Sequence, residues 1–241
     1  MSYLTNKITK IDINIIELYS LCPALAFIQC SGKYNDTGKQ YKSKEELRKL
    51  FNTVVIYLMG RDYSSNVVSS VMRHSIFEEG SKEFEYTRDF LSNFIYMLKQ
   101  DELEITGGII PFEISIGGYI IESCIDCVIK DKKRDTIHPC VIDLSKTRYE
   151  NYYNPILYRV YTIYKHFIVE DIAPEIMVLS PYTGKKWYFY HKGFSDALEH
   201  SIGYYARSVT ESITFHRFGW WCSGCDFRGL CFKLLKTLPN T

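Results

Sequence analysis

Long apolar runs are missing from this sequence: no stretch reaches the roughly eighteen residues that a membrane-spanning helix needs. The N-terminal segment MSYLTNKITKID also lacks the apolar core of a secretory signal peptide. We therefore expect no membrane partner and a cytoplasmic, intracellular location. In such a reducing compartment the 8 cysteines are not expected to form a disulfide framework, so clustered ones are metal ligands or buried small residues.

Net charge is small as well, because 29 Lys and Arg residues balance 28 Asp and Glu residues to give +1. Bulk charge therefore argues neither for nor against a nucleic-acid partner. Internal repeats and low-complexity segments are also absent, which excludes a repeat architecture. The 241 residues, 46% of them hydrophobic, suit one medium domain with a substantial core.

The first part of the chain is predicted to be mainly helical. Apolar residues recur at helical spacing in four segments, which are Ile13–Phe27, Glu45–Met59, Asn66–Glu79 and Glu85–Leu98. The polar, glycine-containing segment Gly32–Ser43 reads as a loop between the first two helices.

After Gly107 and Gly108 the sequence becomes β-branched and alternating, which is typical of strands. The expected strands are Phe112–Ile116, Tyr119–Lys130 and Pro139–Leu144, and the charged turn Asp131–Asp135 lies between the last two. These three strands predict an antiparallel meander.

The rest of the chain alternates helices and strands. A helix is expected from Asn154 to about Phe167, with Asn as its N-cap and a proline at its first position. A hairpin of Glu175–Leu179 and Lys186–Tyr190 follows, and then a helix over Ser195–Ser208. With no clear linker, this order predicts one α/β domain: a helical part over residues 1–110, a sheet core over 111–210 and a cysteine-rich tail over 211–241.

Three cysteines in that tail have the spacing of metal ligands. Cys222, Cys225 and Cys231 form a C-x2-C-x5-C pattern, with glycines that allow the tight turns around an ion or cluster. A fourth ligand is needed, and Cys22, beside a proline near the start of the chain, is the candidate. Thiolates suit an iron–sulfur cluster or a structural zinc, and spacing alone does not separate these from unligated thiols.

The remaining cysteines are interpreted as structural. Cys124 and Cys127 form a second C-x2-C, but residues three apart in a strand point to opposite faces of the sheet. We expect these two, together with Cys30 and Cys140, to be buried apolar residues.

Two aspartates interrupt apolar strands. Asp126 lies within the second expected strand, and Asp143 ends the third. A buried carboxylate is costly unless it is paired or bound to a cation, so two on neighbouring strands predict a shared Mg2+ or Mn2+ ion. His74, expected within a helix, is a candidate third ligand, although a lone histidine is more often a satisfied core or surface residue. The alternative for the aspartates is a role in turns at the strand ends.

The order of these motifs resembles the RecB-like branch of the PD-(D/E)XK nucleases that carries a 4Fe-4S cluster, including AddB and the CRISPR-associated exonucleases. Leu21-Cys22-Pro23 resembles the N-terminal Cys-Pro of that branch, and Val71–His74 its histidine motif. Ile125–Val128 and Val141–Leu144 look like its two acidic motifs. The resemblance continues with Asn154-x3-Tyr158, which looks like a Gln-x3-Tyr helix, and with the three-cysteine tail.

This resemblance implies a restriction-endonuclease-like core, in which a mixed central sheet is flanked by helices. It implies that His74, Asp126 and Asp143 bind a divalent metal for hydrolysis of phosphodiester bonds, and that the cysteines hold a structural 4Fe-4S cluster joining the chain ends. The implied substrate is DNA, as a single strand or a duplex end. The resemblance also implies that Asn154 and Tyr158 contact the DNA strand.

Two positions depart from the family pattern. Its acidic motif is Asp/Glu-x-Lys, but Ser145 stands two residues after Asp143, and Lys146 would face away from the metal in a regular strand unless a bulge turned it back. Asn154 replaces the glutamine and is also a good helix N-cap. Three functions therefore stay open: an active exonuclease with Lys146 as its catalytic lysine, a pseudonuclease acting as a DNA-binding or assembly subunit of a larger complex, and a zinc-stabilised interaction protein.

Basic and aromatic residues near the expected site are candidates for gripping phosphates and stacking bases, although tyrosines at this density are equally often core or surface residues. They are Lys146, Arg148, Arg159 and Lys165, with Tyr149, Tyr152, Tyr153, Tyr158 and Trp187.

Overall fold

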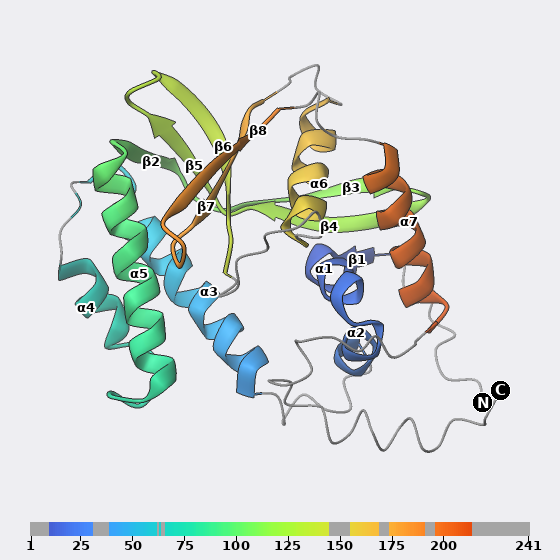
Figure 1. The fold of residues 1–241 in the computed structure, drawn as a ribbon, viewed down its shortest axis with the longest axis horizontal. Coiled ribbons are helices and arrows are strands. Elements are labelled where there is room, and N and C mark those ends of the chain that lie inside the picture. Colours follow the sequence, from blue (N-terminus) through green and yellow to red (C-terminus); the bar gives the residue numbers. More distant parts are fainter. Residues whose placement is uncertain are drawn as a thin grey trace.

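The computed structural model describes residues 10–30, 39–61, 63, 66–144, 155–168, 174–190 and 196–213, with backbone alone for 28–30 and 39–44. Within these ranges the chain is a mixed α/β structure in which helices flank two β-sheets, as Figure 1 shows. The α/β class predicted from the sequence is therefore confirmed.

The described helices largely follow the apolar patterns of the sequence. They are α1 (Ile13–Leu21), α2 (Pro23–Cys30), α3 (Lys39–Leu58), α4 (Asn66–Met72), α5 (Lys82–Gln100), α6 (Ile156–Ile168) and α7 (Asp196–Thr210). At the start of α5 the hydroxyl of Ser81 accepts a hydrogen bond from the Phe84 amide, which satisfies one of the free donors of the first turn.

The expected single helix Ile13–Phe27 is wrong, because the chain breaks between α1 and α2. Cys22 has extended dihedral angles (φ −150°, ψ 100°), as expected for a residue that precedes a proline. Its amide still donates to the Leu18 carbonyl at 2.8 Å, so the break changes the direction of the chain directly after the last turn of α1. The break places the Cys22 side chain at a junction of two helices.

The expected helix Asn66–Glu79 is too long, since α4 ends at Met72. The hydroxyl of Ser75 accepts a hydrogen bond from the Phe77 amide, and the carboxylate of Glu46 accepts one from the Ile76 amide. Side chains thereby take up backbone donors that a continued helix would have used. His74 therefore lies in the turn after α4 and not inside a helix.

The strands form two sheets of mixed direction. They are β1 (Lys10–Asp12), β2 (Leu103–Gly107), β3 (Ile110–Ile116), β4 (Tyr119–Ile125), β5 (Cys127–Asp131), β6 (Thr136–Ile142), β7 (Ile176–Ser180) and β8 (Lys185–Phe189). The smaller sheet has the order β1-β4-β3 and the larger one β2-β5-β6-β7-β8. β1 pairs with β4, and β6 with β7, in parallel; the other pairs are antiparallel.

Sequence reasoning predicted the β7–β8 hairpin correctly but joined β4 and β5 into one strand, which is wrong. Asp126 separates the two strands, and they belong to different sheets. The expected meander therefore consists of two hairpins, β3–β4 and β5–β6, in two sheets. β1 and β2 were not expected at all, because each is short and lies beside a stronger helical pattern.

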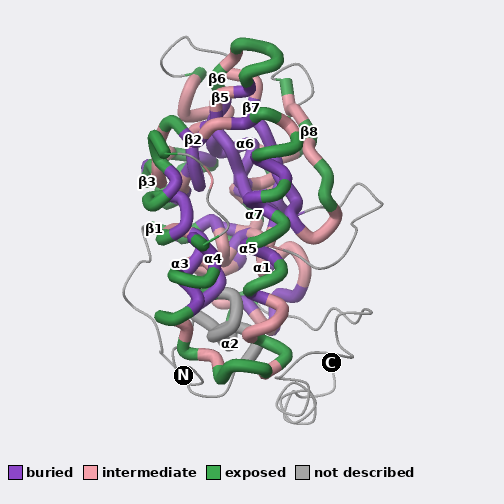
Figure 2. Tube along the Cα trace, turned by 90° about the vertical axis from the view of Figure 1, so that its left-hand side faces the viewer, coloured by how far each residue is buried: buried purple, intermediate pink, exposed green. Residues whose placement is uncertain are grey.

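Three hydrophobic clusters hold the layers together. Helices α3, α4 and α5 pack on one face of the larger sheet, where Phe51, Phe90 and Phe94 are fully buried. Helix α6 packs on the opposite face against β6 and β7, and also contacts β4 of the smaller sheet, where the hydroxyls of Ser123 and Thr162 are 2.8 Å apart. Helices α1 and α7 complete the third cluster beside β4. Figure 2 shows the buried residues concentrated along the strands and the inward sides of these helices.

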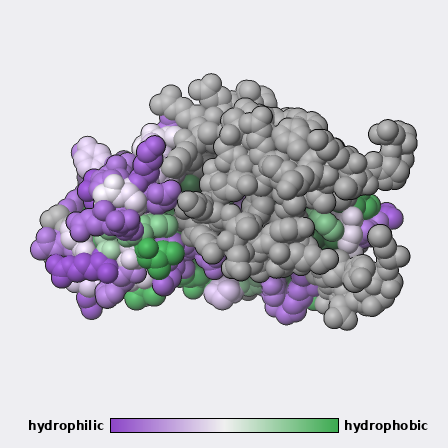
Figure 3. Space-filling model, turned by 90° about the horizontal axis from the view of Figure 1, so that it is seen from below, coloured by the Kyte–Doolittle hydropathy of each residue, from purple (hydrophilic) through white to green (hydrophobic). Residues whose placement is uncertain are grey.

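The outer surface carries scattered apolar side chains among polar ones. Ile56 and Ile76 are each 66% exposed, and Figure 3 shows hydrophobic patches among hydrophilic residues on the side of α3 to α5. Apolar atoms in such numbers are normal on a protein surface. None of the helices that the structure describes is long and apolar enough to cross a membrane.

Candidate functional site

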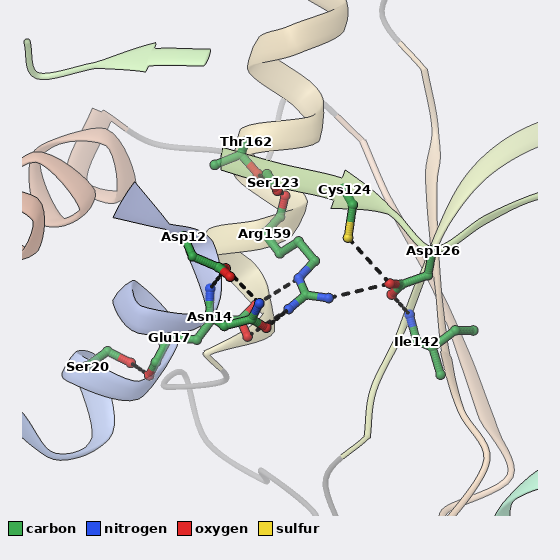
Figure 4. Close-up of polar contacts among 10 residues, drawn as sticks. All are labelled: Asp12, Asn14, Glu17, Ser20, Ser123, Cys124, Asp126, Ile142, Arg159 and Thr162. Atoms are coloured by element: carbon green, nitrogen blue, oxygen red, sulfur yellow. Dashed lines mark hydrogen bonds and ion pairs between the residues drawn. The ribbon is translucent and has the colours of Figure 1, made fainter. Parts of the chain in front are cut away.

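Asp126 lies where the chain passes from the smaller sheet to the larger one (Figure 4). It is 5% exposed, and its amide donates to the Cys140 carbonyl at 3.0 Å. Its carboxylate Oδ2 accepts a hydrogen bond from the Ile142 amide at 2.8 Å. The side chain thus takes the place of a backbone acceptor and ties the end of β6 to the junction of the two sheets.

Asp143 lies one residue after this contact. It is 7% exposed, and its amide donates to the Leu179 carbonyl of β7 at 2.8 Å. Burial raises the pKa of Tyr86 on α5, and the negative charge of Asp143 raises it further. Asp143 is therefore within electrostatic reach of Tyr86, whose ring stacks on that of Tyr182 with 4.4 Å between centroids.

The hydrogen bond to Ile142 brings the two predicted aspartates together, since Asp126 binds the residue that directly precedes Asp143. Asp126 therefore contacts the last residue of β6, and Asp143 directly follows that residue in the chain. Two buried carboxylates on adjoining segments are candidate ligands for a hard divalent cation.

Arg159 of α6 faces Asp126 from the other side. Its Nη1 atom is 3.6 Å from Asp126 Oδ1, too far for a hydrogen bond, and among the described residues this nitrogen has no hydrogen-bond acceptor. The rest of the guanidinium is well held: Nε and Nη2 donate to the two carboxylate oxygens of Glu17, each at 3.1 Å, and Nη2 also donates to Asn14 Oδ1 at 2.6 Å. The guanidinium of Arg159 is therefore bound to residues of α1 through Nε and Nη2, while its Nη1 points at Asp126 (Figure 4).

Burial and charge act in opposite directions in this cluster. Burial alone would lower the pKa of Arg159, but the carboxylates of Glu17 and Asp126 raise it above its ordinary value. Burial raises the pKa of Glu17, while Arg159 and Arg48 lower it in part. The arginine is therefore a fixed cation, as guanidinium groups are in proteins.

The other predicted site residues are less closely associated. His74 is exposed in the turn after α4, and no group of three or more His, Cys, Asp or Glu residues suited to a metal ion is found in the part of the chain that the structure describes. Tyr158 is half-buried in the cluster of α1, α6 and α7, where its ring centroid lies 5.7 Å from that of Tyr205. Lys146 and Asn154 lie outside the described residues.

Cys22 is 9% exposed at the break between α1 and α2. Its three expected partners, Cys222, Cys225 and Cys231, lie outside the described residues, as do the side chain of Cys30 and residues Arg148, Tyr149, Tyr152 and Tyr153. Burial of Cys127 and Cys140 is confirmed, and Cys124 is half-buried. The two cysteines do not share one strand as expected, however, because Cys124 belongs to β4 and Cys127 to β5.

Two of the basic residues expected to grip DNA are engaged elsewhere. Arg159 is 2% exposed and bound to carboxylates, and Lys165 pairs with Glu199 at 2.7 Å. Trp187 on the edge strand β8 remains accessible at 37%. Sequence reasoning missed Glu17 and the carboxylate-bound role of Arg159; the available signal was a charged residue on an otherwise apolar stretch of α6.

Comparisons with known proteins leave the family open. No family model and no curated protein matches the chain. Among the solved structures that match is one described as "Crystal structure of SSO0001", with a TM-score of 0.46 and 14% sequence identity, covering 95% of this chain and 89% of that chain. A likeness at this level assigns neither a fold family nor an activity.

The thiol of Cys124 gives a direct test of this local environment. Burial, and after it the charge of Asp126, raises the pKa of Cys124 to about 11. Since only the thiolate reacts, about one thousandth of the thiol is reactive at pH 8, and the rate of alkylation should rise about tenfold per pH unit from pH 8 to pH 10. Iodoacetamide labelling of the native protein, read by mass spectrometry, measures this rate.

The control for this labelling is the same protein unfolded in guanidinium chloride, in which Cys124 should react at the rate of an ordinary thiol. Native labelling at pH 8 as fast as in the unfolded chain would contradict the described burial beside Asp126.

Proposed function

We propose that this protein is a divalent-metal-dependent DNA nuclease with a restriction-endonuclease-like core. The single observation that carries the proposal is the hydrogen bond from the Ile142 amide to the buried Asp126, which places this aspartate beside the residue that precedes the buried Asp143. The resemblance of the sequence motifs to the cluster-bearing PD-(D/E)XK nucleases supports it independently. The substrate is DNA, as a single strand or a duplex end, and the reaction is hydrolysis of phosphodiester bonds.

The residues fit a hard divalent cation. Mg2+ and Mn2+ prefer carboxylate oxygens, and a site for Mg2+ commonly uses one or two carboxylates, the remaining positions being taken by water and phosphate. Asp126 and Asp143 supply such a pair. A cation bound there would lower the pKa of a water molecule and stabilise negative charge on the phosphodiester.

The residues of the chain itself have separable roles in this proposal. The Ile142 amide fixes one oxygen of Asp126, and the buried Arg159 places a positive charge 3.6 Å from the other. His74 stays a candidate ligand, and Lys146 a candidate for orienting the attacking water.

We also propose that Cys22, Cys222, Cys225 and Cys231 hold a structural 4Fe-4S cluster. Support comes from the C-x2-C-x5-C spacing and from the position of Cys22 at a helix break beside a proline, where a side chain can leave the helical path. Such a cluster would connect the end of α1 to the C-terminal tail. A structural zinc is the alternative for the same thiolates.

A second candidate function is a pseudonuclease that binds DNA, or assembles with other proteins of a nucleic-acid-processing complex, without cleaving it. The observation that favours it is the Arg159 guanidinium at 3.6 Å from Asp126, which partly neutralises the carboxylate that a metal would need. Ser145 in place of the usual lysine favours it further.

Nuclease assays separate the two functions. Labelled single- and double-stranded DNA incubated with Mn2+ or Mg2+ should be degraded by the wild-type protein, and Asp143→Asn should reduce the rate by about a hundredfold or more, because a lost metal ligand removes several kcal/mol of transition-state stabilisation. Asp135→Asn is the matched control, since Asp135 is an exposed turn residue paired with Lys130, and this variant should keep full activity.

Activity that survives Asp143→Asn would show that the cleavage site lies elsewhere. DNA binding by the wild-type protein without any cleavage under either metal would support the pseudonuclease and contradict the enzyme.

Metal content tests the cysteine site. Protein purified without oxygen should contain about four iron atoms per chain, and Cys22→Ser should lower that number, whereas Cys124→Ser should not. A protein that contains zinc and no iron would show that the cysteines bind a structural zinc instead of a cluster. Iron content unchanged in Cys22→Ser would contradict the assignment of Cys22 as the fourth ligand.

A further inference from the structure

Arg159 is more firmly bound to Glu17 than to Asp126, although it lies between them. The Glu17 carboxylate accepts two hydrogen bonds from the guanidinium at 3.1 Å, and Asn14 accepts a third at 2.6 Å. The arm that faces Asp126 stops at 3.6 Å and makes no hydrogen bond to any described residue. A buried guanidinium nitrogen without an acceptor is costly, so something restrains it from closing the remaining distance.

The restraint comes from α1. Both residues that hold Arg159, Asn14 and Glu17, belong to this helix, and Asn14 is itself fixed by Asp12, whose carboxylate accepts from the Asn14 amide at 2.7 Å. A guanidinium is planar and rigid. When Nε and Nη2 are bound to residues of α1, the position of Nη1 relative to Asp126 is therefore set as well. Helix α1 thereby decides how closely the cation approaches the candidate metal ligand.

The distance between Arg159 and Asp126 matters because one guanidinium faces two carboxylates, those of Glu17 and Asp126. Arg48 of α3 also lowers the pKa of Glu17. A guanidinium closed onto Asp126 would compete with a metal for Oδ1, which also accepts a hydrogen bond from the Cys124 thiol at 3.7 Å. A guanidinium held back by Glu17 leaves room for a cation at that oxygen.

We propose that the Glu17–Arg159 pair is a positioning device for the candidate metal site: Glu17 holds the guanidinium away from Asp126, so that Asp126 is available to a divalent cation. This inference rests on the proposed function, since it requires the metal site at Asp126 and Asp143. It also places control of that site on α1, five residues before Cys22, so the cysteine site and the metal site are joined through one helix.

Isothermal titration calorimetry with Mn2+ alone added to the protein tests whether the Glu17–Arg159 pair controls metal binding. Glu17→Gln removes the charge that restrains Arg159 but keeps an oxygen acceptor, so Arg159 should close onto Asp126 and Mn2+ affinity should fall about tenfold. The control is Glu175→Gln, which removes the charge from a more exposed Glu–Arg pair with Arg134 near the start of β6 and should leave the affinity unchanged.

A neutral pair tests the same point without a buried, unbalanced cation. The double variant Glu17→Gln with Arg159→Gln leaves no guanidinium to occupy Asp126, so Mn2+ affinity should return to the wild-type value or above it. This rescue would not occur if Glu17 acted only by keeping α1 folded. A double variant that binds Mn2+ as weakly as Glu17→Gln overturns the device.

The two failures are distinguishable. Wild-type protein that does not bind Mn2+, or binds it equally after Asp126→Asn, overturns the proposed metal site and the device with it. Wild-type protein that needs Asp126 for Mn2+ but shows the same affinity after Glu17→Gln overturns the device alone.

Discussion

The hydrogen bond from the Ile142 amide to the carboxylate of Asp126 organises the centre of this molecule. β6 pairs with β5, which begins only at Cys127, so the amide of Ile142 lies beyond the ladder of these two strands. Asp126 supplies an acceptor from its side chain, while its own amide donates to Cys140. A buried amide without a partner would cost about 1–3 kcal/mol, so the carboxylate is held in place by the requirements of the backbone. The position of Asp143, one residue further on, follows from the same contact.

Buried ion pairs such as those around that contact contribute little net stability. Replacing such a pair with well-packed apolar residues is often neutral or stabilising, whereas removing one partner costs about 3–5 kcal/mol. A network of Glu17, Arg159 and Asp126 is therefore better explained by what it positions. In our proposal it holds the guanidinium of Arg159 at a set distance from the carboxylate of Asp126.

Local signals in the sequence predicted the elements that are local in origin. The apolar stripe of α5 and the turn between β7 and β8 depend on neighbouring residues, and each lies close to its expected place. The separation of β4 from β5 could not be found in this way, because a continuous apolar pattern passes through both strands and only pairing with distant β6 distinguishes them. His74 was placed in a helix because the apolar spacing continues past Met72, where side-chain hydrogen bonds end the helix.

In the candidate site, too, some residues could be recognised from the sequence and others only from the tertiary structure. Asp126 and Asp143 were recognisable because a carboxylate in an apolar strand is conspicuous by itself. The contact of Arg159 with Glu17 was not, since the two residues are 142 positions apart and either one is unremarkable on an amphipathic helix. Pairing over such a distance is a property of the tertiary structure, and it changed the expected role of Arg159 from a phosphate contact to a buried partner of carboxylates.

The most direct test of the metal site is a crystal of the protein soaked in Mn2+ and measured near the manganese absorption edge. The account predicts an anomalous difference peak within about 2.0–2.4 Å of carboxylate oxygens of both Asp126 and Asp143, with Arg159 still bound to Glu17. A structure in which manganese binds elsewhere, or in which Arg159 forms a closed hydrogen-bonded pair with Asp126, would contradict it.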